Sequence, residues 1–408
     1  MRKSTFLNSK MFLPAALTAG IILASGFFAS CKKNDESVVK VGILHSLSGT
    51  MEISETPVKD AELLAIKEIN EKGGVLGKQI KVVIKDGKSD SQTFAEKARE
   101  LLEEDNVVTV FGCWTSASRK AVKPVFEEKY GLLWYPVQYE GMEASPNIMY
   151  MGASPNQQVV PAIDYCAQKI GKKMFLVGSD YVFPKTANKI IKAQLNELDG
   201  KCLGEEYVPM GHSDFSSIIA KIQETKPDVI INTLNGDSNT YFFKQLIEAG
   251  INSKKIPVMS FSIAEEEISQ IGADYLKGNL VSWNYYESTP TPTNEKFVKD
   301  YKMEYGSDRE TGDPIEAGYI GVYMWAAACE KAGSFDVEAV RIAAKGLSFT
   351  APEGTVTIDG SNQHLYKQVR IGIINEAGRI DEIWATSGAI KPDPYLSTYA
   401  WARGIEED

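Results

Sequence analysis

The sequence predicts an α/β fold with two doubly wound, Rossmann-like lobes, each built around a parallel sheet. Two series of short apolar segments alternate with helical segments, one on each side of the stretch Gly152-Ala153-Ser154-Pro155. Strands that alternate with helices need crossover connections, and such connections build parallel sheets. The chain has 408 residues, of which 43% are hydrophobic and 24% charged, which suffices for two domains with cores and excludes a disordered or collagen-like protein.

The first series begins with residues 38–44, whose near-continuous apolar run is typical of a strand buried on both faces. A helix is expected over residues 56–72, because Val58, Ala61 and Ala65 share one face and Gly73 follows its end. The remaining elements of this series are expected as strands 80–84, 107–111 and 132–135 and as helices 91–104 and 116–129.

The second series follows the same alternation and then departs from it. Its helices are expected at residues 157–170, 185–198, 215–223 and 239–249, and its strands at 174–177, 205–208, 228–233, 257–261 and 280–283. Helices at 294–305, 314–331 and 337–345 come next, followed by short strands at 355–358, 368–374 and 380–384.

These last helices are too many for the second lobe alone, so the chain is expected to return to the first lobe near residue 284 and to cross back near residue 348. The first lobe then comprises residues 38–153 and 285–347, the second comprises 154–284 and 348–390, and residues 391–408 form a C-terminal tail. The three connecting segments, expected near 152–156, 283–286 and 347–353, would form a hinge. Ligands bind in the cleft between lobes in such architectures.

The first thirty residues have the pattern of a secretory signal. A basic start precedes an uncharged, mostly apolar stretch at residues 11–30, and the small pair Ala29-Ser30 precedes Cys31. Cys31 resembles the acylated cysteine of a bacterial lipobox, although Phe28 stands where that pattern usually has Leu. We therefore expect a signal peptide at 1–30, a linker at 31–37, and an exported protein, in the periplasm or at the cell surface, that a lipid on Cys31 anchors to the membrane. An uncleaved membrane anchor is the alternative.

Motifs of catalysis and cofactor binding are absent from the sequence. No GxGxxG follows the first strand, and GxSxG, HExxH and CxxC do not occur. The glycines of residues 73–78 are interpreted as a helix-ending turn rather than as a phosphate loop. A net charge of −10 argues against a nucleic-acid partner. The sequence thus predicts a protein that is not an enzyme and that uses no cofactor and no metal.

The few histidines and cysteines do not form a metal-binding pattern. His45, His212 and His364 have no Cys or His neighbour at ligand spacing, and His45 is expected at the surface or as a capping residue. The four cysteines beyond residue 31 are expected as small buried side chains, although Cys166 and Cys202 could pair in an exported protein.

Candidate ligand-binding residues follow the carboxyl ends of the predicted strands, where open α/β sheets bind their ligands. Hydroxyls, aromatic rings, one amide and carboxylates gather in these loops. The candidates are Trp114, Thr115 and Ser116; Val137, Gln138, Tyr139 and Glu140; Tyr181; Asp237; and Glu265. Ser116 is expected either to cap the helix that starts there or to donate to a ligand carbonyl.

This set is rich in acceptors and hydroxyls and contains no cation. Arg119 and Lys120 lie one turn into their helix and are expected to face solvent or a neighbouring strand. A free amino acid or an anion would need an Arg or a helix terminus for its carboxylate. The set therefore suits a small, neutral, planar ligand with many N–H donors, which aromatic rings would sandwich. Its NH₂ groups would donate to Glu140, Asp237 or Glu265.

With these residues the chain resembles the type I periplasmic binding proteins of the short-chain amide and urea branch. Over residues 38–395 it is similar to the substrate-binding lipoproteins of urea ABC transporters. The resemblance is carried by residues 41–50, 112–120, 136, 139–141, 145–147 and 178–184. It implies the type I periplasmic binding protein fold with three crossings between the lobes.

The resemblance also implies roles for individual residues. In the amide-binding relatives, the position of Ser116 and the backbone beside Trp114 hold the amide, and the position of Tyr181 closes over it from the second lobe. Trp114 and Val137 stand where an amide-sensing relative has Tyr and Thr, which favours urea over acetamide. Asp237 and Glu265 would fit the second NH₂ of urea, and an acceptor that acetamide leaves unpaired discriminates by roughly 1–3 kcal/mol.

The expected function is that of a lipid-tethered receptor whose lobes close on urea and present it to the permease of an ABC transporter. A binder of short-chain amides or of branched-chain amino acids is the alternative within the same class. An amide-sensing regulatory protein of the same fold is a further alternative, which the export signal argues against. An amidohydrolase is disfavoured because no nucleophile with a base and no metal-ligand set is found in the sequence.

Overall fold

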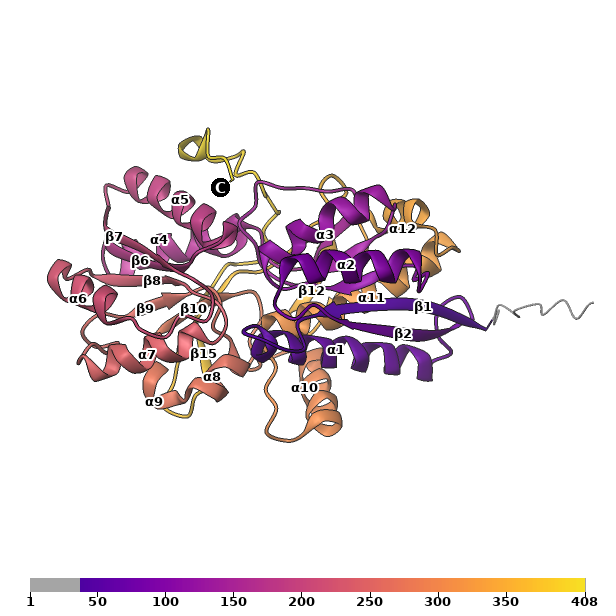
Figure 1. Cartoon of the computed structure of the whole chain (residues 1–408), viewed down its shortest axis with the longest axis horizontal. Helices are drawn as coiled ribbons and strands as arrows, with labels where there is room; N and C mark the ends of the chain where they lie inside the picture. Colours follow the sequence, from indigo (N-terminus) through magenta and orange to yellow (C-terminus); the bar gives the residue numbers. More distant parts are fainter. Residues whose placement is uncertain (1–36, 408) are drawn as a thin grey trace, which may run out of the picture. The chain divides into compact units, whose positions relative to one another are not determined.

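The computed structural model describes residues 37–407, so the predicted signal peptide, Cys31 and most of the linker lie outside the described residues. In the first lobe, parallel strands form one sheet in the order β2-β1-β3-β4-β5. The strands are Val38–His45 (β1), Gln79–Asp86 (β2), Val110–Gly112 (β3), Leu133–Tyr135 (β4) and Ile148–Tyr150 (β5). Figure 1 shows helices on both sides of β1 and β2, with α2 (Ser91–Glu103) on one side and α1 (Glu52–Glu71) on the other.

Helices from two parts of the chain complete this lobe. Helix α1 packs along α11, and α2 packs along α3. The bounds are Ser116–Glu128 (α3), Pro292–Tyr305 (α10), Asp313–Ala332 (α11) and Val337–Ala344 (α12). Helix α1 begins four residues earlier than the sequence predicted, which places Glu52 and Glu55 in its first turn. The strand β5 was missed because three residues are too short to show a period.

The second lobe is built on a sheet in the order β15-β14-β10-β9-β8-β6-β7, which is parallel except at β14 and β15. The strands are Lys173–Ser179 (β6), Lys201–Val208 (β7), Val229–Thr233 (β8), Val258–Ser260 (β9), Leu280–Trp283 (β10), Arg370–Ile374 (β14) and Ile380–Ala385 (β15). Met174 and Leu176 of β6 face one apolar core, and Phe175 and Val177 face another. Both faces of the strand are therefore covered, which explains its continuous apolar run.

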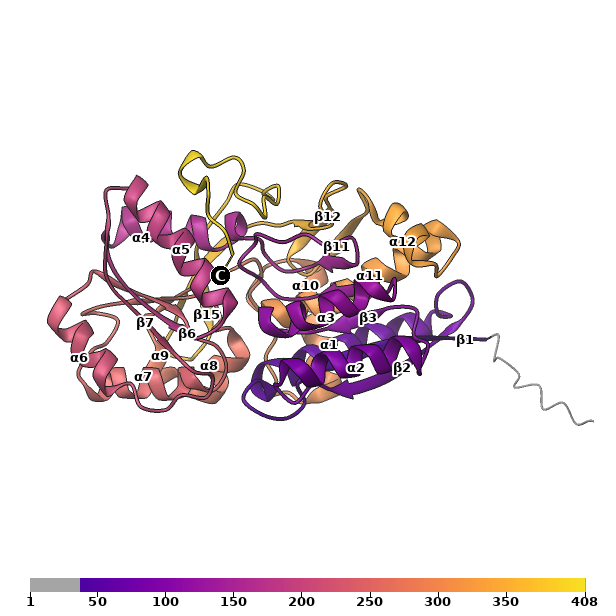
Figure 2. The ribbon, with the colours of Figure 1, turned by 45° about the horizontal axis from the view of Figure 1, so that its top comes forward.

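Two groups of helices supply these cores. One face is covered by α4 (Val159–Lys169) and α5 (Val182–Glu197), which Figure 2 shows together on this lobe. Leu396 and Ala402 of the C-terminal segment join the same core. The other face is covered by α6 (Ser216–Thr225), α7 (Ser238–Glu248), α8 (Glu265–Ile271) and α9 (Ala273–Leu276). The predicted fold of two α/β lobes with parallel-sheet cores is confirmed.

A small antiparallel sheet differs from the expected division of the chain. It consists of β11 (Ser348–Ala351), β12 (Gly354–Ile358) and β13 (Leu365–Tyr366). Ala351, Val356 and Ile358 join the core of the first lobe, so the chain crosses back after Tyr366 rather than near 347–353. Of these strands the sequence predicted only β12, at residues 355–358. The choice of lobe depends on which helices offer an apolar surface, here α10 and α11.

The three connections between the lobes are joined by one side chain. Asn284, directly after β10, donates through Nδ2 to the carbonyl oxygen of Gln157 at 3.0 Å and to that of Gln368 at 2.9 Å. Lys367 is fully buried and donates to the carbonyl oxygen of Met151 at 3.0 Å. The hinge is therefore held by polar contacts between the three connecting segments.

Two further findings concern the described residues as a whole. Within residues 37–407, no helix combines the length and the apolar character that a membrane span requires. Cys113, Cys166, Cys202 and Cys329 are all free thiols, so Cys166 and Cys202 are not paired.

Candidate ligand-binding site

A small cavity of about 130 Å³ lies between residues of the two lobes. Ser46 follows β1, Thr115 follows β3, and both line the cavity from the first lobe. Tyr181 follows β6 and lines it from the second lobe. The site thus lies at the carboxyl ends of parallel strands. Its lining consists of Ser46, Thr50, Met51, Glu55, Ser89, Asp90, Ser91, Phe94, Thr115, Ala117, Ser118, Tyr181 and Met210.

Thr115 caps helix α3 at the edge of the cavity. Its Oγ1 accepts from the backbone N–H of Ser118 at 3.0 Å, so the capping role considered for Ser116 belongs to its neighbour. Ser118 in turn donates to the carbonyl oxygen of Thr115 at 2.8 Å. The amino-terminal end of α3, with its partial positive charge, is thereby fixed beside the cavity.

Tyr181 directly precedes α5 and brings a hydroxyl to the cavity. Burial, together with the neighbouring Tyr135 and Glu140, raises the pKa of Tyr181 well above its usual value. The phenol therefore stays neutral and can donate a hydrogen bond to a bound molecule.

Glu55, in the first turn of α1, is a cavity-lining residue that the sequence analysis did not single out. Its Oε2 accepts from the backbone N–H of Ser46 at 2.8 Å and lies 3.1 Å from Nδ1 of His45. Its Oε1 is buried and has no hydrogen-bond partner within the described part of the chain. An acid in the first turn of a helix is normally explained by the helix dipole, so its position alone gave no signal. The sequence signal that could have identified Glu55 is His45, the last residue of the neighbouring strand β1.

His45 is fully buried, so the expectation of a surface or capping role is wrong. Its ring lies between two carboxylates, with Nδ1 3.1 Å from Glu55 and Nε2 3.1 Å from Glu62. Burial opposes protonation, but the charge of Glu62 and the hydrogen bonds with both carboxylates outweigh it and raise the pKa of His45 to about 9. His45 is therefore an imidazolium at neutral pH.

Ser116 and Glu140 belong to a buried ionic cluster rather than to the cavity lining. Arg119 donates to Glu140 at 2.8 Å, to Glu143 at 2.9 Å and to the hydroxyl of Ser116 at 3.0 Å. The hydroxyl of Ser116 donates to the second oxygen of Glu140. Arg119 is fully buried instead of facing solvent, because two carboxylates of the loop after β4 compensate its charge.

The aromatic residues near this cluster pack within the first lobe. The ring of Tyr139 stacks on that of Tyr150 at 5.0 Å, and the guanidinium of Arg119 lies 4.6 Å from the centre of the Tyr139 ring. Trp114 and Val137 are members of the hydrophobic core of this lobe. The indole N–H of Trp114 is buried without a partner among residues 37–407.

Gln138 connects the lobes next to the site. Its Nε2 donates to the carbonyl oxygen of Phe261 at 2.9 Å and to the hydroxyl of Ser262 at 3.2 Å, and both acceptors belong to the second lobe. A second cross-lobe bond runs from the hydroxyl of Ser54 in α1 to Glu267 in α8, at 2.6 Å. The two lobes are thus in direct contact through both sets of hydrogen bonds.

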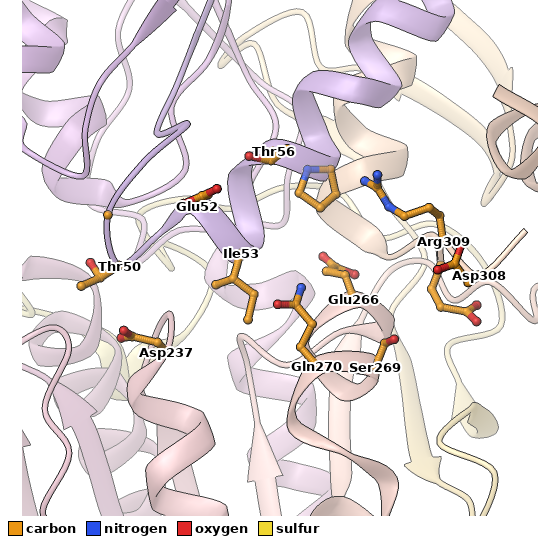
Figure 3. Close-up of a pocket in the computed structure, with 13 residues that line it drawn as sticks. Thr50, Glu52, Ile53, Thr56, Asp237, Glu266, Ser269, Gln270, Asp308 and Arg309 are labelled. Atoms are coloured by element: carbon orange, nitrogen blue, oxygen red, sulfur yellow. The ribbon is translucent and has the colours of Figure 1, made fainter. Parts of the chain in front are cut away.

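Asp237 lines a larger cavity of about 560 Å³ between the start of α1 and α8. Figure 3 shows Asp237 and Glu266 facing Thr50, Glu52 and Ile53 across this space. Thr50 lines both cavities, so the larger one adjoins the smaller. Burial raises the pKa of the Asp237 carboxyl.

Glu265, the first residue of α8, lies apart from both cavities. Its Oε1 accepts from the backbone N–H of Glu287 at 2.7 Å, and its Oε2 is buried without a partner among the described residues. Burial raises the pKa of this carboxyl well above its usual value. Of the ten residues predicted from the sequence, the structure brings Thr115 and Tyr181 together at the small cavity and places Asp237 at the larger one.

A comparison with protein families gives one match that covers most of the chain. The model of the periplasmic binding protein domain matches residues 39–400. The chain belongs to this family. Its members are solute-binding proteins, which agrees with the predicted absence of enzymatic activity.

One sequence relative and two solved structures match this chain over most of their length. The Leu/Ile/Val-binding protein homolog 6 of Brucella suis is 24% identical over 83% of this chain and 88% of its own. A solute-binding protein of an ABC transporter from Rhodopseudomonas palustris HaA2, in complex with p-hydroxybenzoic acid, has a TM-score of 0.80 at 23% identity over 86% and 98% of the two chains. The branched-chain amino acid transporter substrate-binding protein LivJ from Streptococcus pneumoniae, in complex with isoleucine, has a TM-score of 0.75 at 22% identity over 87% and 100%.

Proposed function

We propose that this periplasmic binding protein is an extracytoplasmic receptor that binds urea in the small cavity and delivers it to the permease of an ABC transporter. The observation that carries the proposal is the volume of the cavity, about 130 Å³. Sites for drug-sized ligands measure roughly 300–1,000 Å³, and a cavity of roughly 150 Å³ accommodates a benzene ring. The site is thus sized for a ligand of very few heavy atoms, such as urea or acetamide.

The chemistry of the lining supports a neutral ligand. Among the residues that line the cavity there are hydroxyls and two carboxylates, from Glu55 and Asp90, and no Lys, Arg or His. Carboxylate ligands are usually held by Arg or by several convergent N–H donors. The carbonyl oxygen of urea would accept from the hydroxyl of Tyr181, and its NH₂ groups would face the carboxylates.

The ligands bound by the two related structures fit less well. Isoleucine and p-hydroxybenzoate each carry a carboxylate and are more than twice as large as urea. A branched-chain amino acid remains the second candidate because relatives such as the Brucella suis protein are named as Leu/Ile/Val-binding homologues. Acetamide matches urea in size and differs by one NH₂ group, so it is the more stringent competitor.

Calorimetric titration of the purified protein tests this proposal. Urea, acetamide, isoleucine and p-hydroxybenzoate are titrated into the wild type, into Tyr181→Phe and into the control Tyr130→Phe, whose tyrosine is 81% exposed. We expect tight binding of urea, a loss of roughly tenfold in Tyr181→Phe, as one hydrogen bond predicts, and no change in the control. Binding of isoleucine or p-hydroxybenzoate without binding of urea would overturn the proposal.

A transport assay tests the delivery step. A strain that lacks this protein should lose high-affinity uptake of labelled urea, and the wild-type gene should restore it. Undiminished uptake in the deletion strain would contradict a role in delivery to a permease.

A further inference from the structure

The carboxylate of Glu55 belongs to the lining of the small cavity, and only one of its two oxygens has a hydrogen-bond partner within residues 37–407. Glu55 is 1% exposed and lines the cavity, and its Oε1 is buried without a hydrogen-bond partner among residues 37–407. Leaving a buried carboxylate oxygen unsatisfied costs more than leaving a neutral group unsatisfied. The energy of the site therefore improves when a ligand brings an N–H donor to this atom.

The rest of the Glu55 carboxylate is fixed by its own neighbours. Its Oε2 accepts from the backbone N–H of Ser46 at 2.8 Å and is paired with His45 at 3.1 Å. His45 is held from its other side by Glu62 at 3.1 Å. These contacts prevent the carboxylate from turning, so Oε1 keeps its direction before a ligand arrives, and such preorganisation favours affinity and selectivity.

The charges around Glu55 favour a neutral donor over a cation or an anion. The carboxyl groups of Glu55 and Glu62 flank the single ring of His45, so acidic groups outnumber basic ones around this ring. The charge of Lys59 acts to lower the pKa of Glu62. The charge of Glu55 acts to raise the pKa of the Cys113 thiol and of the Tyr181 hydroxyl. An incoming carboxylate would be repelled, whereas an NH₂ group would satisfy Oε1 without the large desolvation cost of an ammonium.

We infer that Glu55 is the residue that selects urea over other small amides, by accepting a hydrogen bond from an NH₂ group that acetamide lacks. The inference rests on the proposed function. It replaces Asp237 and Glu265 as acceptors, because Asp237 lines the adjoining cavity and Glu265 already accepts from the backbone of Glu287.

The test compares Glu55→Gln with Glu52→Gln by titration with urea and with acetamide. Glu52 lies in the same turn of α1 but is exposed, so it controls for a general change of charge at this helix end. In the wild type and in Glu52→Gln, urea should bind roughly 10- to 100-fold more tightly than acetamide. In Glu55→Gln the affinity for urea should fall by a similar factor while that for acetamide changes little, so the preference disappears.

The titrations distinguish a failure of the proposed function from a failure of the role inferred for Glu55. Failure of the wild type to bind urea contradicts the proposed function and the inference together. Binding of urea that Glu55→Gln retains within twofold leaves the proposed function standing and overturns the inference. If Glu55→Gln does not fold, the wild type alone decides with a series of urea, N-methylurea and acetamide. Equal affinity for urea and acetamide then refutes a role for Glu55.

Discussion

Removal of the Arg119 guanidinium would show whether the loop after β4 serves stability or ligand binding. Arg119 is fully buried and forms ion pairs of 2.8 Å with Glu140 and 2.9 Å with Glu143. The substitution Arg119→Met keeps a long apolar side chain against the ring of Tyr139 and removes the charge. Glu140 then loses its ion pair and keeps the hydroxyl of Ser116 as a donor.

The ion pairs of Arg119 determine how much the free energy of unfolding should fall. Breaking a buried ion pair by removing one member costs about 3–5 kcal/mol. Glu143 retains Lys120 at 2.9 Å, so one of the two carboxylates remains compensated. Burial raises the pKa of Glu143, but Arg119 and Lys120 outweigh it and hold that pKa at about 2, which shows how strongly the cations act here. We expect a decrease in the free energy of unfolding of about 3 kcal/mol, near the lower end of that range.

The assay is equilibrium unfolding in guanidinium chloride, followed by circular dichroism and tryptophan fluorescence. Urea is unsuitable as a denaturant because it is the proposed ligand. The control is Arg99→Met, whose ion pair with Glu128 is also short, at 3.0 Å, but has side chains that are 41% and 55% exposed. Exposed pairs contribute little, so the control should keep the wild-type midpoint. A loss in Arg119→Met no larger than that of the control would refute the reasoning and return Glu140 to the ligand candidates.

Three further predictions concern pH, capping and lobe closure. The pKa of His45 is raised to about 9 from 6.5, so its stabilisation is complete below pH 6.5 and is lost as pH rises through about 9. Guanidinium unfolding between pH 6 and 10 should show this loss in the wild type, and a matching slope in His45→Gln would contradict it. Thr115→Ala removes the cap of α3 and should lower the free energy of unfolding by about 1 kcal/mol, measured in the same way; an unchanged midpoint would show that the cap is dispensable. Ser54→Ala removes the 2.6 Å cross-lobe bond to Glu267 and should weaken urea binding roughly three- to tenfold in calorimetry; unchanged affinity would mean that this contact does not stabilise the bound state.

The sequence and the structure agree on features that depend on residues close together in the chain. The strand β1 was predicted because its near-continuous apolar run indicates burial on both faces. Ligand sites lie beyond the carboxyl ends of parallel strands, so Thr115, after β3 of the first lobe, and Tyr181, after β6 of the second, could be expected to line a cleft between the lobes.

The disagreements involve partners that are distant in the sequence. Arg119 has the appearance of a surface residue on its helix, and only the loop after β4, which brings Glu140 and Glu143 to it, explains its burial. The strand β12 was predicted as a strand but not as part of the first lobe, and β11 and β13 were not predicted. Neither the burial of Arg119 nor the lobe to which the small sheet belongs produces a periodic pattern in the sequence.

The sequence by itself determined the two α/β lobes, their parallel sheets and the loops that can carry a ligand site, because helices and strands are encoded in local apolar periods. Only the tertiary structure decided which polar side chains share a site. It placed Glu55 beside His45 and Glu62 at the small cavity, and it placed Glu140 in the ion pair with Arg119. Buried polar groups require partners of matching charge and geometry, and these partners meet only when the crossovers have brought their elements together.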